Sequence, residues 1–292
     1  MKYAELYRIG KESLIKAGIA EAELDARLLL EYICHTNRND LLVHGDREVS
    51  PENETQYLEW INKRAAHIPL QHITGVQEFM GLEFEVNKHV LIPRQDTEIL
   101  VEEILKDLHD GTVILDMCTG SGCILISLLN YSNDCEGVGV DISADAIAVA
   151  KRNSEKLLSG KTDSTRYSFV ESNLFEAFYE SKELEQDFDD RFDIIVSNPP
   201  YIRSDVIPTL MEEVKGHEPI GALDGYDDGL YFYREIIKNA GEYLYPGGML
   251  FFEIGCEQAE DVSNLMKEEG YQAVTVCKDL AGLDRVVYGT KL

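Results

Sequence analysis

Residues 113–124 read VILDMCTGSGCI, and this stretch decides the fold. Its first five residues predict a buried strand, the glycines after them predict a loop, and the apolar residues that follow predict a helix. In an open parallel sheet, a loop that follows a strand borders the crevice where ligands bind. The stretch therefore predicts an α/β protein with a ligand site at residues 116–122.

Strand and helix patterns alternate from Asp96 to the end of the chain. The predicted strands are 113–117, 137–141, 167–171, 193–198, 249–254, 271–276 and 284–289, and the predicted helices include 124–130 and 144–156. Repeated strand–helix units indicate a mostly parallel sheet with helices on both faces. The loop between the last two strands is too short for a crossover helix, so these strands are expected to pair antiparallel. Residues 180–193 are rich in acids and are expected to form a solvated connection.

The first part of the chain has a different pattern. Apolar residues recur with a helical period, and Ser50-Pro51 predicts a helix start with Ser as the N-cap and Pro at the first helical position. A strand-like alternation follows and predicts a β-hairpin linker. The expected organisation is a helical domain (1–73), a β-hairpin linker (74–93) and an α/β domain (94–292).

Composition restricts the partners and the location. The chain of 292 residues has a formal net charge of −27, whereas binding to nucleic acid or to an anionic membrane depends on Lys and Arg. Such an acidic protein would attract a basic protein partner, and the alternative is that the excess of acids simply aids solubility. The N-terminus has no signal-peptide pattern and no window is apolar enough to span a membrane, so we expect a cytoplasmic protein. Its six cysteines have no metal-ligand spacing, so we expect reduced thiols and no metal site.

Two acidic residues mark the ends of the first two predicted strands of the sheet. Asp116 begins an Asp-x-x-x-Gly-x-Gly loop, but Leu125 stands where a dinucleotide-binding loop needs Gly or Ala, and no Walker lysine is present. An acid at this point suits a ligand with cationic or hydroxyl groups better than a phosphate. Asp141 is able to accept hydrogen bonds from a ribose, although Asp is also common as a helix N-cap. Together the two acids point to S-adenosylmethionine.

The fourth predicted strand ends in Asn198-Pro199-Pro200-Tyr201. Prolines do not continue a central strand, so the chain leaves the sheet here. The rigid exit frees the Asn198 side chain and the Pro199 carbonyl as acceptors beside the flat Tyr201 ring. Two acceptors and an aromatic wall suit a planar group that carries an NH₂, although an ordinary loop with a stacked Tyr is the simpler reading of the motif alone.

The chain resembles the HemK/PrmC-type N5-glutamine methyltransferases of peptide chain release factors. The matching stretches are 69–86, 90–102, 113–124, 192–202, 212–236, 245–258 and 279–287. The resemblance implies a class I S-adenosylmethionine-dependent methyltransferase, with a Rossmann-like seven-stranded sheet whose last strand is antiparallel. It also implies methyl transfer to the glutamine of the Gly-Gly-Gln loop of class-1 release factors, in translation termination. The helical domain (1–73) is then a substrate-docking domain, and residues 94–292 are the methyltransferase catalytic domain. We expect the protein to act as a monomer, without direct nucleic-acid binding.

The resemblance also implies roles for individual residues. Asn198, Pro199 and Tyr201 are the expected catalytic residues, and Pro200 joins them in substrate binding. The expected cofactor-binding residues are Asp116, Cys118, Thr119, Gly120, Ser121, Gly122, Asp141, Asn173, Leu174 and Asn198. His67, His72 and His217 are expected not to take part in catalysis, because methylation of an amide needs no dedicated base.

Three positions depart from the family pattern. Gln95 stands where Pro is usual, and Tyr226 stands where a second Gly is usual. Asn173 replaces an Asp that lies near the adenine amino group in the family. Because an Asn side chain still accepts a hydrogen bond through its carbonyl oxygen, we expect cofactor binding to survive, in weaker form.

Other functions share parts of this pattern. Adenine-N6 methyltransferases also carry Asn-Pro-Pro-Tyr, but the acidity of the chain and the absence of a target-recognition domain argue against nucleic acid. A ribosomal protein is an alternative glutamine-containing substrate. A catalytically silent adaptor would bind release factors through residues 1–73, and the intact loop and tetrapeptide argue against it.

Overall fold

The computed structural model describes residues 1–179 and 191–292. The chain forms two compact units, one made of Met1–Val76 with Met211–His217 and the other of Gln77–Leu210 with Glu218–Leu292. The acidic connection expected at 180–193 lies outside the described residues, except for its last three. Residues 211–217 cluster with the helical unit, although the sequence pattern grouped them with the catalytic domain.

A seven-stranded sheet with the order β5-β4-β3-β6-β7-β9-β8 is the centre of the second unit. The strands are β3 (Val113–Met117), β4 (Glu136–Asp141), β5 (Tyr167–Glu171), β6 (Phe192–Ser197), β7 (Leu244–Glu253), β8 (Gln272–Lys278) and β9 (Asp284–Thr290). The first five pair in parallel, and β9 runs antiparallel to both β7 and β8. The predicted sheet and its antiparallel end are therefore confirmed. Strand β7 begins five residues before the predicted residue 249, because Leu244 pairs with Phe192 ahead of a register shift.

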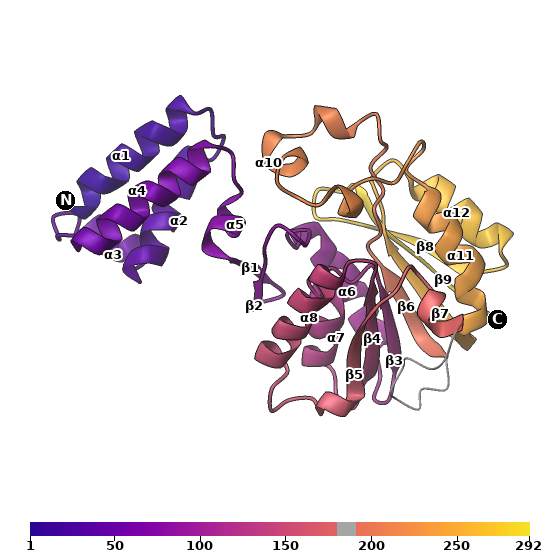
Figure 1. Cartoon of the computed structure of the whole chain (residues 1–292). Helices are drawn as coiled ribbons and strands as arrows, with labels where there is room; N and C mark the ends of the chain where they lie inside the picture. The colour runs from indigo at the N-terminus through magenta and orange to yellow at the C-terminus, as the bar shows by residue number, and fades with distance from the viewer. Residues whose placement is uncertain (180–190) are drawn as a thin grey trace. The chain divides into compact units, whose positions relative to one another are not determined.

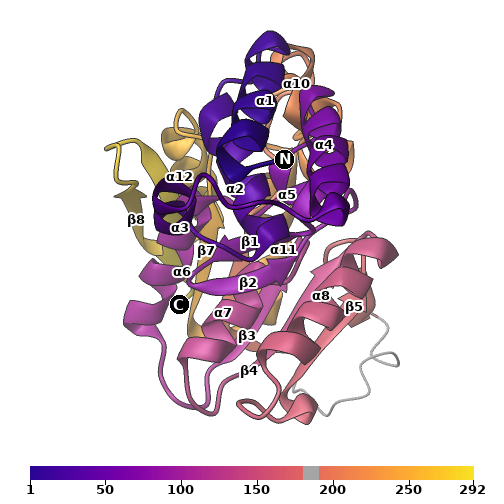
Figure 2. The same ribbon diagram turned by 90° about the vertical axis from the view of Figure 1, so that its left-hand side faces the viewer.

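Helices cover both faces of this sheet (Figure 1). The helices on one face are α6 (Gln95–Asp107), α7 (Cys123–Tyr131) and α8 (Ala144–Leu157), and those on the other are α11 (Tyr231–Tyr243) and α12 (Ala259–Glu268). Figure 2 shows α8 beside β5, which it contacts. Along β6, Ile194 and Val196 pack in the core under α6 and α7, while Ile195 packs in the core under α11. Burial on both faces explains why the strands are almost continuously apolar.

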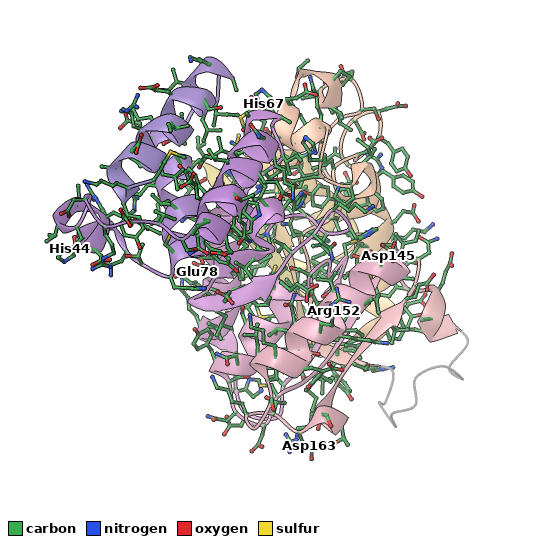
Figure 3. All side chains as sticks on the ribbon, turned by 60° about the vertical axis from the view of Figure 1, so that its left-hand side comes forward. His44, His67, Glu78, Asp145, Arg152 and Asp163 are labelled. Carbon is green, nitrogen blue, oxygen red and sulfur yellow. The ribbon has the colours of Figure 1, made fainter. Side chains whose placement is uncertain are left out.

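The predicted hairpin is formed by β1 (Val76–Phe79) and β2 (Leu82–Glu85). Helix α8 holds β2 through two side chains. The Arg152 guanidinium, labelled in Figure 3, donates to the Glu85 carboxylate at 2.6 and 3.0 Å. The Asn153 side chain accepts from the Glu85 N–H at 2.7 Å and donates to the Glu85 carbonyl at 3.0 Å. Asn153 also donates to the Ser121 carbonyl at 3.0 Å, so it ties the hairpin to the glycine-rich loop.

The first unit is helical, as predicted. Its N-terminal helices are α1 (Tyr3–Lys16), α2 (Ala22–Cys34), α3 (Arg38–Val43), α4 (Pro51–Ala65) and α5 (Leu70–Thr74). Ser50 caps α4 by accepting from the Asn53 N–H at 3.1 Å. A Cβ atom on Gly10 would lie 2.0 Å from the Tyr57 hydroxyl oxygen, so only Gly allows α1 and α4 to approach so closely. Helix α3 was not predicted, because its six residues are too few to show a helical period.

The remaining elements are short. They are α9 (Glu176–Tyr179), α10 (Glu212–Lys215) and the 3₁₀ turns η1 (Ser164–Arg166), η2 (Ile207–Thr209) and η3 (Ile220–Ala222). Within the described ranges, no helix has the length and apolar character that a bilayer crossing requires.

A buried arginine ties α10 into the helical unit. The Arg64 side chain, on α4, donates to the Asp25 carboxylate of α2 at 2.7 Å and to the Glu213 carboxylate of α10. It also donates to the Ile68 carbonyl at 3.3 Å. Arg64 and Asp25 are both buried, and burial raises the pKa of Asp25 although the guanidinium opposes this. One side chain therefore neutralises two acids from separate parts of the sequence.

Replacing Arg64 by Met should destabilise the helical unit strongly. The substitution leaves Asp25 buried without a cation, which typically costs about 3 kcal/mol of unfolding free energy. Trp60, the single tryptophan, lies on α4, so its fluorescence during urea denaturation reports this unit. The matched control is the double variant Asp25→Asn/Arg64→Met, which should lose less because no buried charge remains. Equal losses in both variants would contradict this account.

Candidate active site

The glycine-rich loop between β3 and α7 is bent by three residues in the left-handed region. Cys118, Gly120 and Gly122 have φ angles of 62°, 56° and 79°. A Cβ atom on Gly122 would lie 2.8 Å from Ile126 Cδ1, whereas one on Gly120 would have no neighbour within 4 Å. Gly122 is therefore required for packing, and Gly120 leaves the backbone open to a ligand.

The Asp116 carboxyl group holds this loop through hydrogen bonds. Its Oδ2 atom accepts from the Thr119 hydroxyl at 2.6 Å and from the Leu125 N–H at 3.3 Å. Its Oδ1 atom is buried and has no hydrogen-bond partner among the described residues. Burial raises the pKa of Asp116 to about 7, against the opposing effect of the two hydrogen bonds. The loop is thus fixed by a carboxyl group that is costly to ionise.

Asp141, at the end of β4, is hydrogen-bonded to the glycine-rich loop. Its Oδ2 atom accepts from the Gly120 N–H at 2.9 Å, and its Oδ1 atom accepts from the Ser143 N–H at 3.0 Å. Burial raises the pKa of Asp141, and these backbone bonds oppose the rise. Because each carboxylate oxygen has two lone pairs, both are still able to accept a ligand hydroxyl.

The segment after β5 forms a tight turn. Leu174 has a φ of 50°, and the Ser172 hydroxyl donates to the Leu174 carbonyl at 2.7 Å. The exposed Asn173 donates from its Nδ2 atom to Glu176 Oε1 at 2.7 Å. This bond fixes the amide so that Oδ1 is the atom left to accept a bond from a ligand.

The Asn-Pro-Pro-Tyr segment begins where β6 ends. The Ser197 hydroxyl donates to the Met117 carbonyl at 2.7 Å and so joins this segment to the end of β3. Asn198 Nδ2 donates to the Thr97 hydroxyl oxygen at 3.3 Å. The amide oxygen of Asn198 is therefore the end that remains for a ligand.

The Tyr201 ring and backbone are held by other segments. The Tyr201 hydroxyl donates to Glu253 Oε1 at 3.4 Å, and burial raises the pKa of the phenol. The Tyr201 carbonyl accepts from Gln258 Nε2 at 3.1 Å. A Cβ atom on Gly229 would lie 2.4 Å from the same carbonyl oxygen, so the chain at Gly229 packs directly on the tetrapeptide.

A cavity of about 440 Å³ joins these strand ends. This volume lies in the range of small-molecule sites. The predicted residues that line it are Cys118, Thr119, Gly120, Ser121, Asp141, Asn173, Leu174, Asn198 and Pro200. Asp116, Gly122, Pro199 and Tyr201 are not among its lining residues. Asp116 and Gly122 support the loop, and ligand contacts by these four residues stay predictions.

Sequence reasoning missed several residues around the cavity. Thr97, Glu253 and Gln258 lie in stretches that carry the family resemblance, but spacing along the chain does not show that they meet. Tyr226 lines the cavity with Tyr231, and their ring centroids are 4.7 Å apart. Tyr226 has a φ of 67°, a conformation that favours glycine, which agrees with the usual Gly of the family at this position.

The three histidines that were expected to be non-catalytic belong to the helical unit. His67, labelled in Figure 3, follows α4, His72 lies on α5 and His217 follows α10. None of the three lines the cavity. His89 does line it, and its Nδ1 atom lies 3.2 Å from the Asp145 carboxylate.

The raised pKa of Asp116 predicts how stability depends on pH. Between its ordinary value of 3.8 and its folded value of about 7, the folded protein keeps a proton that the unfolded chain has lost. Stability from this group is therefore greatest at acid pH and falls as pH rises toward 7, by up to about 1.4 kcal/mol per pH unit. Urea denaturation at pH 5, 6 and 7 should show a smaller fall for Asp116→Asn, which keeps an acceptor for Thr119. Identical slopes in the two proteins would reject this pKa.

Comparison with known proteins identifies both parts of the chain. Residues 5–75 match the PrmC N-terminal domain, and residues 108–287 match a methyltransferase domain. The chain is 41% identical over 290 residues to the release factor glutamine methyltransferase of Clostridium acetobutylicum, covering 96% of this chain and 98% of that protein. It is 41% identical over 276 residues to the enzyme of the same name from Geobacter sulfurreducens, covering 94% and 92%.

The fold also occurs among solved structures. A methyltransferase from Pyrococcus furiosus superimposes with a TM-score of 0.50 at 17% identity, covering 83% of this chain and 99% of that chain. The class I methyltransferase fold expected from the sequence is thereby confirmed. With its relatives matching from end to end, the chain belongs to the release factor glutamine methyltransferases, a family of S-adenosylmethionine-dependent enzymes.

Proposed function

We propose that this protein transfers a methyl group from S-adenosylmethionine to the side-chain amide nitrogen (N5) of a glutamine, the one in the Gly-Gly-Gln loop of a class-1 peptide chain release factor. The observation that carries the proposal is the orientation of Asn198. Its amide oxygen is free to accept at a cavity that the glycine-rich loop and Asp141 also line. The names of the relatives give the substrate class.

The cavity fits the cofactor, which supplies an activated methyl group when bound. Asp141 would hold the ribose hydroxyls with the lone pairs that the backbone leaves free. The open backbone at Gly120 would lie along the methionine end. Asn173 Oδ1 would accept from the adenine amino group, in place of the carboxylate that is usual in the family.

The acceptor nitrogen is a weak nucleophile because its lone pair is delocalised into the carbonyl of its own amide. Asn198 Oδ1 and the Pro199 carbonyl would accept its two N–H bonds, which orients the nitrogen toward the methyl group. The same two acceptors would stabilise the positive charge that develops on the nitrogen in the transition state. The N–C bond forms as the S–C bond breaks, and the methylated nitrogen then loses a proton to water.

The helical unit would dock the release factor. Its residues 5–75 match the PrmC N-terminal domain, and the formal net charge of the whole chain is −27. An acidic enzyme attracts a basic partner at long range, so association should become slower as salt concentration rises. An association rate that does not change with salt would remove this part of the proposal.

Asn198→Ala should lower kcat by about 100-fold or more, because it removes an acceptor that acts on charge developing in the transition state. The assay incubates the protein with S-adenosylmethionine and a bacterial class-1 release factor, then measures methylation of the Gly-Gly-Gln glutamine by mass spectrometry. Cofactor affinity, measured by isothermal titration, should change less than threefold. A wild-type protein that binds the cofactor but leaves this glutamine unmodified would reject the release factor as substrate, and ribosomal proteins would be tested next.

Asp141→Asn should weaken cofactor binding more than it lowers kcat, the reverse of what is expected for Asn198→Ala. It replaces one carboxylate oxygen by an NH₂ group that faces a backbone N–H, so the hydroxyl acceptors are disturbed. We expect the cofactor dissociation constant to rise about tenfold or more, with a smaller change in kcat at saturating cofactor. Unchanged affinity in titration calorimetry would exclude Asp141 from the ribose site, and Asn198→Ala serves as the matched control.

A further inference from the structure

Three aromatic side chains form part of the cavity wall, and they are Tyr226, Tyr231 and Phe232. The ring centroid of Tyr226 lies 4.7 Å from that of Tyr231 and 5.8 Å from that of Phe232. Phe232 packs against the core under α11, whereas Tyr226 and Tyr231 are 50% and 41% exposed. These three rings, called the aromatic wall below, therefore rest on the core and keep a surface that a ligand is able to cover. The mechanism proposed above gives them no role.

Tyr226 holds a backbone conformation that is unfavourable for a residue with a Cβ atom. Its φ of 67° lies in the left-handed region, which glycine adopts without strain. Strained residues of this kind persist where the surrounding structure fixes them, and they concentrate at active sites and ligand-binding sites. A glycine would form the same turn with less strain, so a use of the ring explains the tyrosine better than local folding does.

The backbone at Tyr226 is attached to the segment that follows Asn-Pro-Pro-Tyr. The Gly225 N–H donates to the Ile202 carbonyl at 2.7 Å. The Ser204 N–H donates to the Tyr226 carbonyl at 3.0 Å. A Cβ atom on Gly225 would lie 2.8 Å from the Tyr201 Cα atom, so the two stretches of backbone are in direct contact. Tyr226 is thus fixed to the part of the chain that would hold the acceptor amide.

This attachment lies at the acceptor end of the cavity and not at the adenine end. Asn173, proposed above to bind the adenine amino group, follows β5, which is the third strand from β6 in the sheet. Neighbouring strands lie about 4.8 Å apart, so about 14 Å separates β5 from β6. Tyr201 is held by Glu253 of β7 and by Gln258, on the side of β6 away from β5. The backbone of Tyr226, which contacts this segment, is therefore nearer to the acceptor amide.

A flat apolar wall suits the loop that the proposed reaction modifies. Tyrosine presents a large and rigid ring face, which packs well against peptide planes and Cα–H groups. A glycine has no Cβ atom, so its backbone is able to lie directly against such a ring. Two glycines precede the glutamine in a Gly-Gly-Gln loop. Their backbone would cover the ring of Tyr226 while the glutamine side chain reaches Asn198.

We infer that Tyr226 is a substrate-binding residue, whose ring packs against the glycine backbone of the release factor loop and so holds the glutamine at Asn198. The inference rests on the proposed function, since it concerns how the substrate of that reaction is held. Tyr231 and Phe232 support the ring of Tyr226 at its edge. In this role Tyr226 contributes to affinity for the release factor and takes no part in methyl transfer itself.

The first test is Tyr226→Gly, which removes the ring and suits the left-handed backbone. We expect KM for the release factor to rise about tenfold, the change that follows the loss of one well-packed aromatic contact. The value of kcat should stay within about threefold of wild type, and the cofactor dissociation constant from titration calorimetry within about twofold. The matched control is Tyr226→Phe, which keeps the ring and should leave KM within about twofold of wild type.

Three results would overturn the inference. The first is an unchanged KM in Tyr226→Gly. The second is a rise in the cofactor dissociation constant without a rise in KM, because the ring would then pack against the adenine. The third is a rise in KM in Tyr226→Phe as large as in Tyr226→Gly, because the hydroxyl and not the ring face would then bind the substrate. Thermal unfolding of each variant separates a loss of binding from a loss of folded protein.

The second test asks whether the ring contacts the glycines. Release factors in which each glycine of the loop is replaced in turn by alanine are assayed with the wild-type enzyme and with Tyr226→Gly. The added methyl group would collide with the ring, so for at least one glycine the loss of kcat/KM should be about fivefold larger in the wild type. Equal losses in both enzymes, at both glycines, would overturn the contact. Tyr226→Asn, which also tolerates a left-handed backbone, replaces Tyr226→Gly in both tests if the glycine variant does not fold.

The proposed function and the role of Tyr226 fail in different ways. A wild-type protein that binds S-adenosylmethionine but leaves the release factor unmodified contradicts the proposed function. Full methylation by the wild type, together with an unchanged KM in Tyr226→Gly, contradicts only the role of Tyr226.

Discussion

The parallel pairing of β3 with β4 on one side and β6 on the other is the constraint on which the site depends. It aligns Met117 with Val140 and with Ser197, so the residues that follow these strands emerge at one edge of the sheet. Asp141 and Asn198 lie 57 positions apart in the printed sequence. They nevertheless line one cavity because their strands flank the same neighbour. This is the crevice that ligands occupy in open α/β sheets.

Buried carboxyl groups recur around this edge. Asp116 fixes the glycine-rich loop, and Glu253 accepts from the Tyr201 hydroxyl. Burial raises the pKa of each carboxyl group to about 7. Apolar residues in these places would stabilise the fold more. Both carboxyl groups instead determine where a neighbouring hydrogen-bond donor points. The buried carboxyl groups lower the stability of the fold at this edge of the sheet, and they fix the orientation of neighbouring polar groups. Perturbed pKa values of this kind cluster at functional sites.

Much of the fold follows from patterns within short windows. The seven strands, the hairpin and the Ser50 cap come from local periodicity and turn residues, and the glycine-rich loop is recognisable from its own spacing. Helix α3 was not predicted because its six residues are too few to show a helical period. The loop residues and Asn198 were foreseeable because each follows a strand. Thr97, Glu253 and Gln258 were not, since their roles depend on contacts between segments that only the folded chain brings together. The ion pair that attaches Glu213 to Arg64 was not predicted, for the same reason.

That attachment has a consequence for the architecture of this chain. The chain passes between the two compact units three times, at 76–77, 210–211 and 217–218. The helical unit is therefore discontinuous, and Glu213 belongs to it as much as Asp25 does. A chimera that replaced only residues 1–76 would remove Arg64 and leave Glu213 without its partner. The two segments form one folded unit, although 134 residues of other sequence separate 76 from 211.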